Sequence, residues 1–272
     1  MPARLYRHNI ALHVTPHIGT LRLTDLDALA LNGRYADLLA TGRTDGTGGL
    51  SPQTVRWIHV VLHRAFKDAV RWKRLAVNPC GTADPPKASA SAAPEMTTWN
   101  AATLADFLAR SHSSGDPYFA AWHVLATTGL RRGEALGLRW ADIDLATRRA
   151  SIRQTVIVVD HCLAFGTPKT AKGRRQIALD PGTVAVLREH RKRQLEQRVL
   201  LGAGWPDHDL VFTLVDGSPV HPERFSREFK RRIDRWKLPH IRLHDLRHTW
   251  ATLALQAGVH PKVVSERLGQ PV

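Results

Sequence analysis

A run of proline, alanine and serine divides this sequence into two parts of different character. Residues 84–94 read DPPKASASAAP and show no apolar periodicity, which is typical of a linker between domains. The part before this run contains only helical patterns, whereas the part after it mixes helical patterns with short runs rich in Val and Ile. At 272 residues the chain is long enough for two domains with separate cores. We therefore predict a helical domain over residues 1–83, a linker over 84–95, and an α+β domain, mainly α with a small antiparallel sheet, over 96–272.

Two helices are predicted with defined ends in the first part. One extends from Thr24 to Ala40, with Thr24 as its N-cap and two acids in its first turn. The other opens at Ser51-Pro52 and continues to about Arg74. Its apolar face is predicted from helical spacing to comprise Val55, Ile58, Leu62, Ala65, Phe66, Ala69 and Trp72. Its opposite face carries a cationic stripe that comprises Arg56, His59, His63, Lys67, Arg71 and Arg74.

The charge balance indicates which kind of partner this stripe would suit. Lys and Arg number 39 against 24 Asp and Glu, a net charge of +15, and the sequence pI is near 10.8. Such an excess favours a polyanionic partner, because each cation that neutralises a phosphate releases condensed counterions. A solvated helix face would give the same stripe, and the arginine usage of a GC-rich genome would give the same balance. Charge therefore favours nucleic acid without specifying an activity.

Other features exclude several classes of protein. No stretch approaches eighteen consecutive apolar residues, so no membrane span is expected, and the first ten residues lack the apolar core of a signal peptide. Cys80 and Cys162 lie far apart without a C-x-x-C partner, which argues against a disulfide framework and a zinc ribbon. A reduced, cytoplasmic protein without a cofactor or metal is the resulting expectation.

The second part is predicted to contain helices and three short strands. The helical patterns cover Thr97–Ser111, Asp116–Thr128, Gly182–Leu201, Pro222–Trp236, Leu243–Ala257 and Pro261–Leu268. The strand patterns cover Arg149–Asp160, Cys162–Phe165 and Arg174–Leu179.

Three separated clusters in this part contain side chains that could act on a phosphodiester. Residues 128–134 read TGLRRGE, and residues 167–170 read TPKT at the turn between predicted strands, with Lys172 close behind. Residues 244–248 read HDLRH, which places His244 and Arg247 on one face of a helix. Each cluster alone is more typical of a surface ion pair or a solvated turn than of a catalytic site.

Together the clusters supply a set suited to metal-free phosphoryl transfer. In-line attack places negative charge on the non-bridging oxygens, which guanidinium groups match bidentately at any relevant pH. Fixed cations there stabilise the transition state more than the ground state. A histidine can transfer the proton of an attacking hydroxyl, and a lysine can protonate the departing sugar oxygen. A metal-dependent nuclease is disfavoured, since its site would need grouped carboxylates.

The order and spacing of the clusters resemble the tyrosine recombinases, specifically the integrases of actinobacterial phages and integrative elements. Residues 128–144 (TGLRRGEALGLRWADID) are similar to the first arginine box of that family, and residues 244–251 (HDLRHTWA) to its H-x-x-R box. Residues 7–83, which include GLSPQTV at 49–55, look like the core-binding domain that closes over DNA opposite the catalytic domain.

The resemblance implies a role for each matching residue. Arg131 and Arg247 would bind the scissile phosphate, and His244 would be the general acid/base partner. Lys169 would be the lysine of the strand hairpin, with Lys172 as the alternative, and Glu134 would support the first arginine box. The implied partner is double-stranded DNA at attachment-type sites, on which four copies would assemble if the protein were complete.

The sequence departs from the family pattern near its end. Gln270 follows Leu268-Gly269 where the family has a histidine or tryptophan, and no tyrosine comes after it. The three tyrosines, Tyr6, Tyr35 and Tyr118, match no nucleophile position, and the family's N-terminal arm-type domain is also missing. We expect a chain truncated at both ends that binds duplex DNA and does not cleave it alone. The alternatives are a non-catalytic DNA-binding regulator and a remnant of an integrase.

Overall fold

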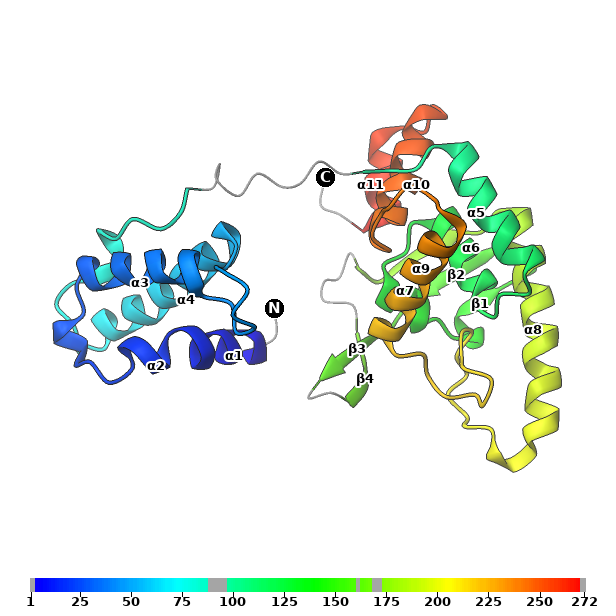
Figure 1. The fold of residues 1–272 in the computed structure, drawn as a ribbon. Helices are drawn as coiled ribbons and strands as arrows, with labels where there is room; N and C mark the ends of the chain where they lie inside the picture. The colour runs from blue at the N-terminus through cyan, green and yellow to red at the C-terminus, as the bar shows by residue number, and fades with distance from the viewer. Residues whose placement is uncertain (1–2, 88–96, 160–161, 168–172, 270–272) are drawn as a thin grey trace. The chain divides into compact units, whose positions relative to one another are not determined.

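The computed structural model describes residues 3–87, 97–159, 162–167 and 173–269. The chain forms two compact units, Met1–Pro94 (unit 1) and Glu95–Val272 (unit 2) (Figure 1). Residues 88–96, which include most of the predicted linker, lie outside the described ranges.

Unit 1 is built from helices in all its described regular elements. These are α1 (Ala3–His13), α2 (Thr15–Ile18), η1 (Leu23–Asp25), α3 (Ala28–Thr41), α4 (Pro52–Arg71) and η2 (Pro79–Gly81). Its core is formed where α3 packs against α4 and η2, with Leu31 and Leu38 of α3 and Val55 of α4 fully buried. These residues recur at helical spacing, so each helix turns one apolar face inward.

The predicted start of the first helix is wrong by three residues. Leu23–Asp25 forms a short 3₁₀ turn, and α3 begins only at Ala28. Asp27, not Thr24, is the N-cap, because its carboxylate accepts a hydrogen bond from the backbone N–H of Ala30 at 2.8 Å. The hydroxyl of Thr24 instead donates to the neighbouring carboxylate of Asp25. Thr24 and Asp27 both carry a side chain that can cap a helix, and the more C-terminal of the two caps α3.

The second predicted helix is confirmed at its start and shortened at its end. Ser51 caps α4 by accepting a hydrogen bond from the N–H of Thr54, as the Ser-Pro signal predicts. The helix stops at Arg71 because Lys73 takes a left-handed conformation with φ 58°, so Arg74 lies beyond it. Ala65 and Trp72, both predicted for the apolar face, are exposed, and the guanidinium of Arg71 lies over the Trp72 ring at 5.7 Å.

Unit 2 combines longer helices with short strands. Its helices are α5 (Ala101–Ser113), α6 (Phe119–Thr128), α7 (Arg132–Leu136), η4 (Trp140–Asp142), α8 (Pro181–Leu201), η6 (Gly202–Gly204), α9 (Pro222–Trp236), α10 (Asp245–Gln256) and α11 (Pro261–Leu268). Its strands are β1 (Ile143–Asp144), β2 (Arg149–Ile152), β3 (Thr155–Val159), β4 (Cys162–Gly166) and β5 (Arg175–Ala178). The expected class, mainly α with a small antiparallel component, is confirmed.

The strands form two antiparallel sheets within the described ranges rather than the single sheet that the sequence predicted. One has the order β1-β2-β5, with Ala150 opposite Ile177, and the other is the β3–β4 hairpin, with Val156 opposite Phe165. The predicted strand Arg149–Asp160 is therefore two strands, β2 and β3, separated at residues 153–154. The break falls at Arg153-Gln154, which includes no Gly, Pro or Asn to mark a turn, so no signal in the sequence indicates that the chain changes pairing partner there.

The helix starts in unit 2 agree best with the sequence where a proline occupies the first helical position, as in α8, α9 and α11. The ranges predicted for α9 and α11 are confirmed, and α8 begins one residue earlier than predicted, with Asp180 as its N-cap. α5, α6 and α10 begin two to four residues later than predicted. Asp116 explains the late start of α6, since its buried carboxylate accepts the N–H of Tyr118 and forms an ion pair with Arg232.

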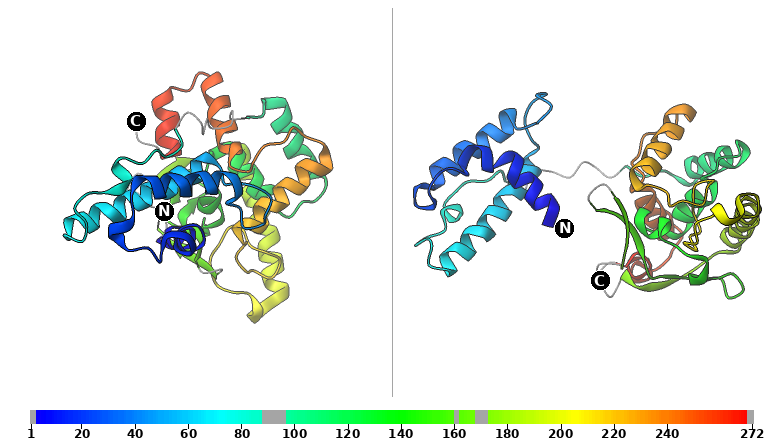
Figure 2. Two further views of the ribbon diagram at one scale, coloured as in Figure 1. Left: turned by 60° about the vertical axis from the view of Figure 1, so that its left-hand side comes forward. Right: turned by 90° about the horizontal axis from the view of Figure 1, so that it is seen from below.

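The core of unit 2 is an aromatic cluster that joins helices far apart in the sequence. Trp122 of α6 stacks on Phe225 of α9 with ring centroids 4.0 Å apart, and Phe107 of α5 meets Phe229 of α9 at 5.3 Å. Such contacts add to the burial of large apolar surfaces. In the three ribbon views α8 lies at the periphery of this unit (Figures 1 and 2).

No helix in the described ranges is long and apolar enough to cross a membrane.

Candidate functional site

The turn after α6 positions the first arginine of the site. Gly129 ends α6 in the left-handed conformation, with φ 66° and ψ 21°, which glycine adopts without steric cost. A Cβ atom there would also lie 2.7 Å from the ring of Trp250 on α10 and 2.8 Å from Leu268 on α11. Glycine therefore allows α10 and α11 to approach the turn that leads to Arg131.

Arg131 is held in an ion-pair network around a buried carboxylate. Glu134 of α7 accepts hydrogen bonds from the backbone N–H of Arg131 at 3.0 Å and from its guanidinium at 2.8 Å. The guanidinium of Arg175, on β5, binds both oxygens of the same carboxylate at 3.1 and 2.9 Å. Burial alone would raise the pKa of Glu134, but the hydrogen bonds and charge of Arg175, with those of Arg131, lower it. A charged carboxylate therefore fixes two guanidinium groups.

Arg247, from α10, is buried with its donors directed at the backbone. Its guanidinium donates to the carbonyl of Gly129 at 2.8 Å and also to the carbonyl of Leu268 at the end of α11. Burial, followed by the positive charge of Arg131, lowers the pKa of Arg247 to about 10. The group therefore stays protonated at neutral pH, and the α6 turn and α11 fix its place.

His244 lies one turn before Arg247, at the N-cap of α10, and its side chain is exposed. Its ring meets that of His248 edge-on, with centroids 5.2 Å apart. The pKa of His244 is lowered, first by partial desolvation and then by the charges of His248, Arg247 and Arg131. A neutral imidazole able to accept a proton thus prevails at neutral pH.

Two of these side chains, Arg131 and His244, border one groove of about 530 Å³ on unit 2. Arg247 is not among the lining residues: it is buried, and its guanidinium is bonded to the carbonyl of Gly129, two residues before Arg131. The other lining residues are Arg132, Gly133, Ser226, Phe229, Lys230, His240, Ile241, Arg242 and Leu243. Of the four residues proposed for the chemistry, the structure therefore places two on the groove and a third, Arg247, against the turn that leads to Arg131. Lys169 and its alternative Lys172 lie outside the described residues.

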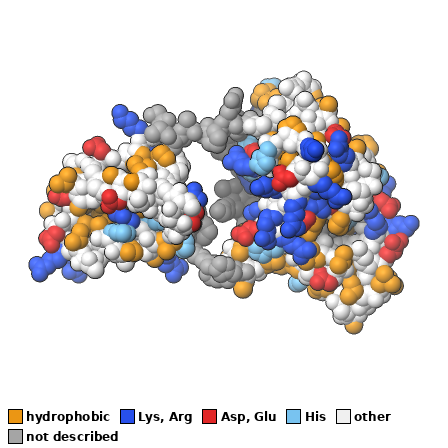
Figure 3. All heavy atoms as spheres, in the orientation of Figure 1, with side chains coloured by type: hydrophobic (Ala, Val, Ile, Leu, Met, Phe, Trp, Pro, Cys, Tyr) orange, Lys and Arg blue, Asp and Glu red, His pale blue; other side chains and the backbone are white. Residues whose placement is uncertain are grey.

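Two features of this site were missed by the sequence reasoning. Arg175, whose side chain is 8% exposed, shares the buried face of β5 with Ile177, and the two-residue period of a strand could have indicated this. The other is α9, which buries Phe225, Phe229 and Ile233 and exposes five cations. These cations are Arg224, Arg227, Lys230, Arg231 and Arg235. Figure 3 shows Lys and Arg side chains gathered over the part of unit 2 that contains α9 and α7.

The cationic stripe of α4 in unit 1 is less uniform than its sequence suggested. His59 is half-buried, and its Nδ1 is hydrogen-bonded to the hydroxyl of Tyr35 at 2.9 Å. Arg56 donates to the carbonyl of Pro86, and Arg71 forms an ion pair with Asp68 at 3.3 Å. The remaining members of the stripe, His63, Lys67 and Arg74, are exposed.

The side chains that border the groove favour one kind of ligand. No group of three His, Cys, Asp or Glu side chains that could hold a metal ion occurs among the described residues. The guanidinium groups of Arg131, Arg132 and Arg242 and the imidazole of His244 border one groove, and none of its lining residues is an acid. Such a set binds an oxyanion, because planar guanidinium groups match its oxygens in charge and geometry.

Comparison with known proteins identifies the family. Residues 96–270, more than half of the chain, match the model of the phage integrase family, and the chain therefore belongs to this family of tyrosine recombinases. The chain is 30% identical to the integrase of Mycobacterium phage D29 over 226 residues, which cover 82% of this chain and 57% of that integrase. It is 28% identical to a XerC-like tyrosine recombinase of Caldanaerobacter subterraneus subsp. tengcongensis, over 81% of this chain and 60% of that protein.

The integrase of Mycobacterium phage L5 is 28% identical over 97% of this chain and 66% of its own length. The chain thus spans about three fifths to two thirds of the length of these relatives. Among solved structures, the integrase of transposon Tn1549 in complex with transposon right-end DNA has a TM-score of 0.79 and 20% identity, covering 99% of this chain and 86% of that one. Lambda integrase residues 75–356, a dimer bound to a core site, has a TM-score of 0.68 and 15% identity, covering 99% and 87%. These two structures share the fold.

Proposed function

We propose that this chain binds duplex DNA and holds a phosphodiester in the groove of unit 2, as part of a site-specific recombination or integration protein. The observation that carries the proposal is the position of Arg131 and His244 on one groove, with Arg247 buried behind it and bonded to the turn that leads to Arg131. A DNA-binding regulator without chemistry would not need the N-cap residues of α7 and α10 to share one groove in this way. The recombinase function is therefore favoured over the regulator.

The two arginines would bind the non-bridging oxygens of the phosphate. Arg131 is fixed by the carboxylate of Glu134, so it does not need to reorganise when charge develops on the oxygens. Arg247, which is buried and bonded to two backbone carbonyls, would have to direct a further donor toward the phosphate. Fixed guanidinium groups of this kind stabilise the more highly charged transition state.

His244 and the hairpin lysine would handle the protons. With its pKa lowered, His244 is neutral at pH 7 and can accept the proton of an attacking hydroxyl. We assign the protonation of the departing sugar oxygen to Lys169, with Lys172 as the alternative. Nucleophilic attack by a tyrosine would form a phosphotyrosine bond and conserve the bond energy for rejoining.

We further propose that these 272 residues do not cleave DNA by themselves. Of the three tyrosines, Tyr118 is buried against Trp122 and Phe225, and Tyr35 is buried and bonded to His59. Tyr6 stacks on Trp57 at 4.7 Å, and none of the three lines the groove. A duplex with a nick at a candidate site, mixed with the chain and then denatured, is expected to give no covalent adduct. An adduct would refute this part of the proposal.

DNA binding itself is tested by a gel shift of a duplex at rising salt. Exposed cations on α9 and the α4 stripe supply the sequence-independent attraction. Each neutralised phosphate contributes about 0.9 to the slope of log affinity against log salt. We expect a shift at low salt that weakens steeply as salt rises. Absence of a shift even at low salt would contradict the proposal.

A further inference from the structure

The outer face of α8 combines an exposed apolar strip with cations, and neither feature belongs to the groove described above. The inner face of the helix is buried through Val184, Leu187 and Gln194. On the outer face Leu195 is 51% exposed, Val199 81% and Leu200 87%. Single exposed apolar side chains are common, but three within six residues form a continuous apolar surface.

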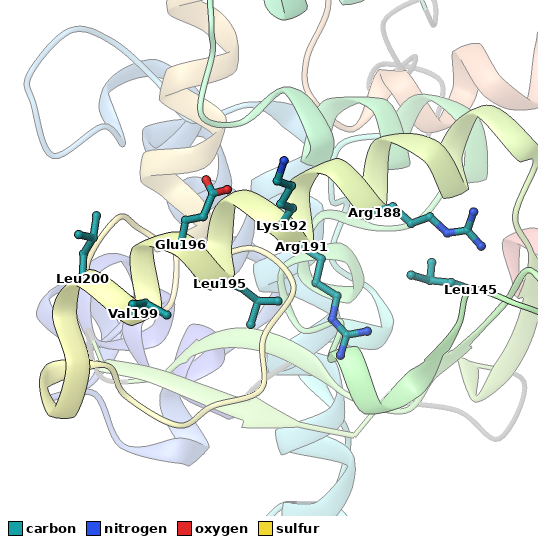
Figure 4. A pocket seen from close by; sticks show the side chains of 8 residues that line it. All are labelled: Leu145, Arg188, Arg191, Lys192, Leu195, Glu196, Val199 and Leu200. Atoms are coloured by element: carbon teal, nitrogen blue, oxygen red, sulfur yellow. The ribbon is translucent and has the colours of Figure 1, made fainter.

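This strip borders a shallow hollow of about 770 Å³ (Figure 4). Its lining comes from α8 and from the segment after β1, and comprises Leu145, Arg188, Arg191, Lys192, Leu195, Glu196, Val199 and Leu200. Figure 4 shows these α8 side chains following the helix axis, with Leu145 beside Arg188. Residues 188, 192, 195 and 199 are spaced so that they share one face of α8. A second helix could lie along this face and contact all four residues.

The charges on this face are unbalanced. Arg188 and Lys192 have no ion-pair partner among the described residues, and Glu196 is the single acid among the lining residues. Arg191 is engaged differently, since its guanidinium lies over the ring of Trp140 at 5.1 Å. The face therefore presents apolar surface together with cations available for an external acid.

Charge and polarity together select the occupant. Phosphates of a DNA duplex would match Arg188 and Lys192 but would bury Val199 against a hydrated backbone, with no apolar gain. A second copy of this chain carries a net charge of +15 and would place like charges against this face. We propose that the outer face of α8 docks an acidic amphipathic helix of another protein, with leucine-type side chains over Leu195 and Val199 and carboxylates toward Arg188 and Lys192.

The proposal is tested with a fluorescently labelled model helix and needs no DNA. The probe is a Leu/Glu peptide of about four turns with Leu at positions i, i+4 and i+7, long enough to form on docking. Its control is a peptide of the same composition with the leucines scattered around the helix. Binding of the probe to the whole chain is measured by fluorescence anisotropy. We expect it to be saturable, and we expect the peptide with scattered leucines to bind at least about tenfold more weakly.

Matched variants locate the binding surface. Leu195→Glu with Val199→Glu is expected to weaken probe binding about tenfold or more, and Arg188→Glu with Lys192→Glu to do the same and to reduce its salt dependence. Leu29→Glu, at an apolar residue 79% exposed on α3, should leave binding unchanged. Circular dichroism verifies that each variant is folded.

Three outcomes would overturn the proposal: no saturable binding, equal binding of both peptides, or binding unaffected by the α8 variants. Loss of DNA binding in the Leu195→Glu, Val199→Glu variant would assign the face to nucleic acid instead. The probe assay contains no DNA, so its result is independent of the proposed recombination function. Either proposal can be refuted while the other stands.

Discussion

The α4 stripe of unit 1 and the groove of unit 2 are both cationic, yet they are built in opposite ways. Lys67 of α4 and Arg74, just beyond the end of this helix, are exposed to solvent, and Arg71 is paired with Asp68 at the surface. In unit 2, Arg247 is 3% exposed with its donors on two carbonyls, and Glu134 is 4% exposed between two guanidinium groups.

The difference separates attraction from positioning. Exposed cations act at a distance, are screened by salt and contribute little to folding. Buried cations are held in one geometry, and that geometry requires acids and carbonyls behind them. The stripe is therefore suited to holding any phosphate backbone, whereas the groove is suited to orienting one phosphate. Variants of the two regions can break or sharpen this contrast.

The largest expected effect follows from replacing Glu134 with Gln. This change leaves Arg175 buried without its counter-charge, so we expect the free energy of unfolding to fall by about 3 kcal/mol. Urea denaturation monitored by circular dichroism measures the change. Glu266→Gln, at an exposed acid of α11, serves as the control and should change stability by less than about 0.5 kcal/mol. Equal effects of the two variants would show that the buried ion pairs of Glu134 contribute no more to stability than an exposed acid does.

The same carboxylate predicts a pH dependence. Because folding lowers the pKa of Glu134 below its ordinary value of 4.5, its contribution to stability is complete above pH 4.5 and is lost as pH falls through the folded pKa. The difference in unfolding free energy between the native chain and Glu134→Gln should therefore be constant from pH 7 to pH 5, and should shrink at lower pH. A difference that grows on acidification would contradict this assignment.

A smaller loss is expected from Arg247→Met, which retains most of the apolar stem but removes both hydrogen bonds. The carbonyls of Gly129 and Leu268 would lose their buried donor, at a cost of about 2 kcal/mol. Hydrogen exchange should locate the loosened region at α11 and at the turn after α6. Arg247→Lys keeps one donor and should lose less. Uniform loosening throughout unit 2 would argue against the anchoring role.

The smallest effect on stability is expected on α4. Lys67→Ala with Arg74→Ala removes two exposed cations, and we expect stability to change by less than about 0.5 kcal/mol. The salt dependence of DNA affinity should nevertheless decrease, by up to about 0.9 for each phosphate that the variant no longer neutralises. A large loss of stability with unchanged salt dependence would mean that these two cations stabilise the fold and do not bind DNA, contrary to the proposal.

Sequence reasoning predicted the features that depend on local chemistry. Ser51-Pro52 gave the start of α4, Gly129 the end of α6, and the spacing of His244 and Arg247 one face of α10. Each of these features depends on residues a few positions apart, so contacts with distant parts of the chain do not alter it. The order of the arginine and histidine clusters was enough to predict the family.

The features that were missed depend on partners distant in sequence. Arg175 reaches Glu134 across 41 residues, and no local pattern names that partner. The division of Arg149–Asp160 into two strands depends on which strand each half pairs with. On α4, the helical period assigned His59 to the exposed side, whereas the hydroxyl of Tyr35 on α3 draws its ring partly inward. Tertiary contacts decided each of these cases.

The most direct test of a positioned phosphate in the groove compares the DNA affinity of Arg131→Ala with that of Arg193→Ala. Both change one arginine, but Arg193 lies on α8, paired with Glu189 at the surface and outside the groove. Fluorescence anisotropy on one duplex at fixed low salt should show about tenfold weaker binding for Arg131→Ala, as expected for loss of a charge-assisted hydrogen bond, and little change for Arg193→Ala. Equal affinities of the two variants would mean that Arg131 holds no phosphate, and the account of the groove would be wrong.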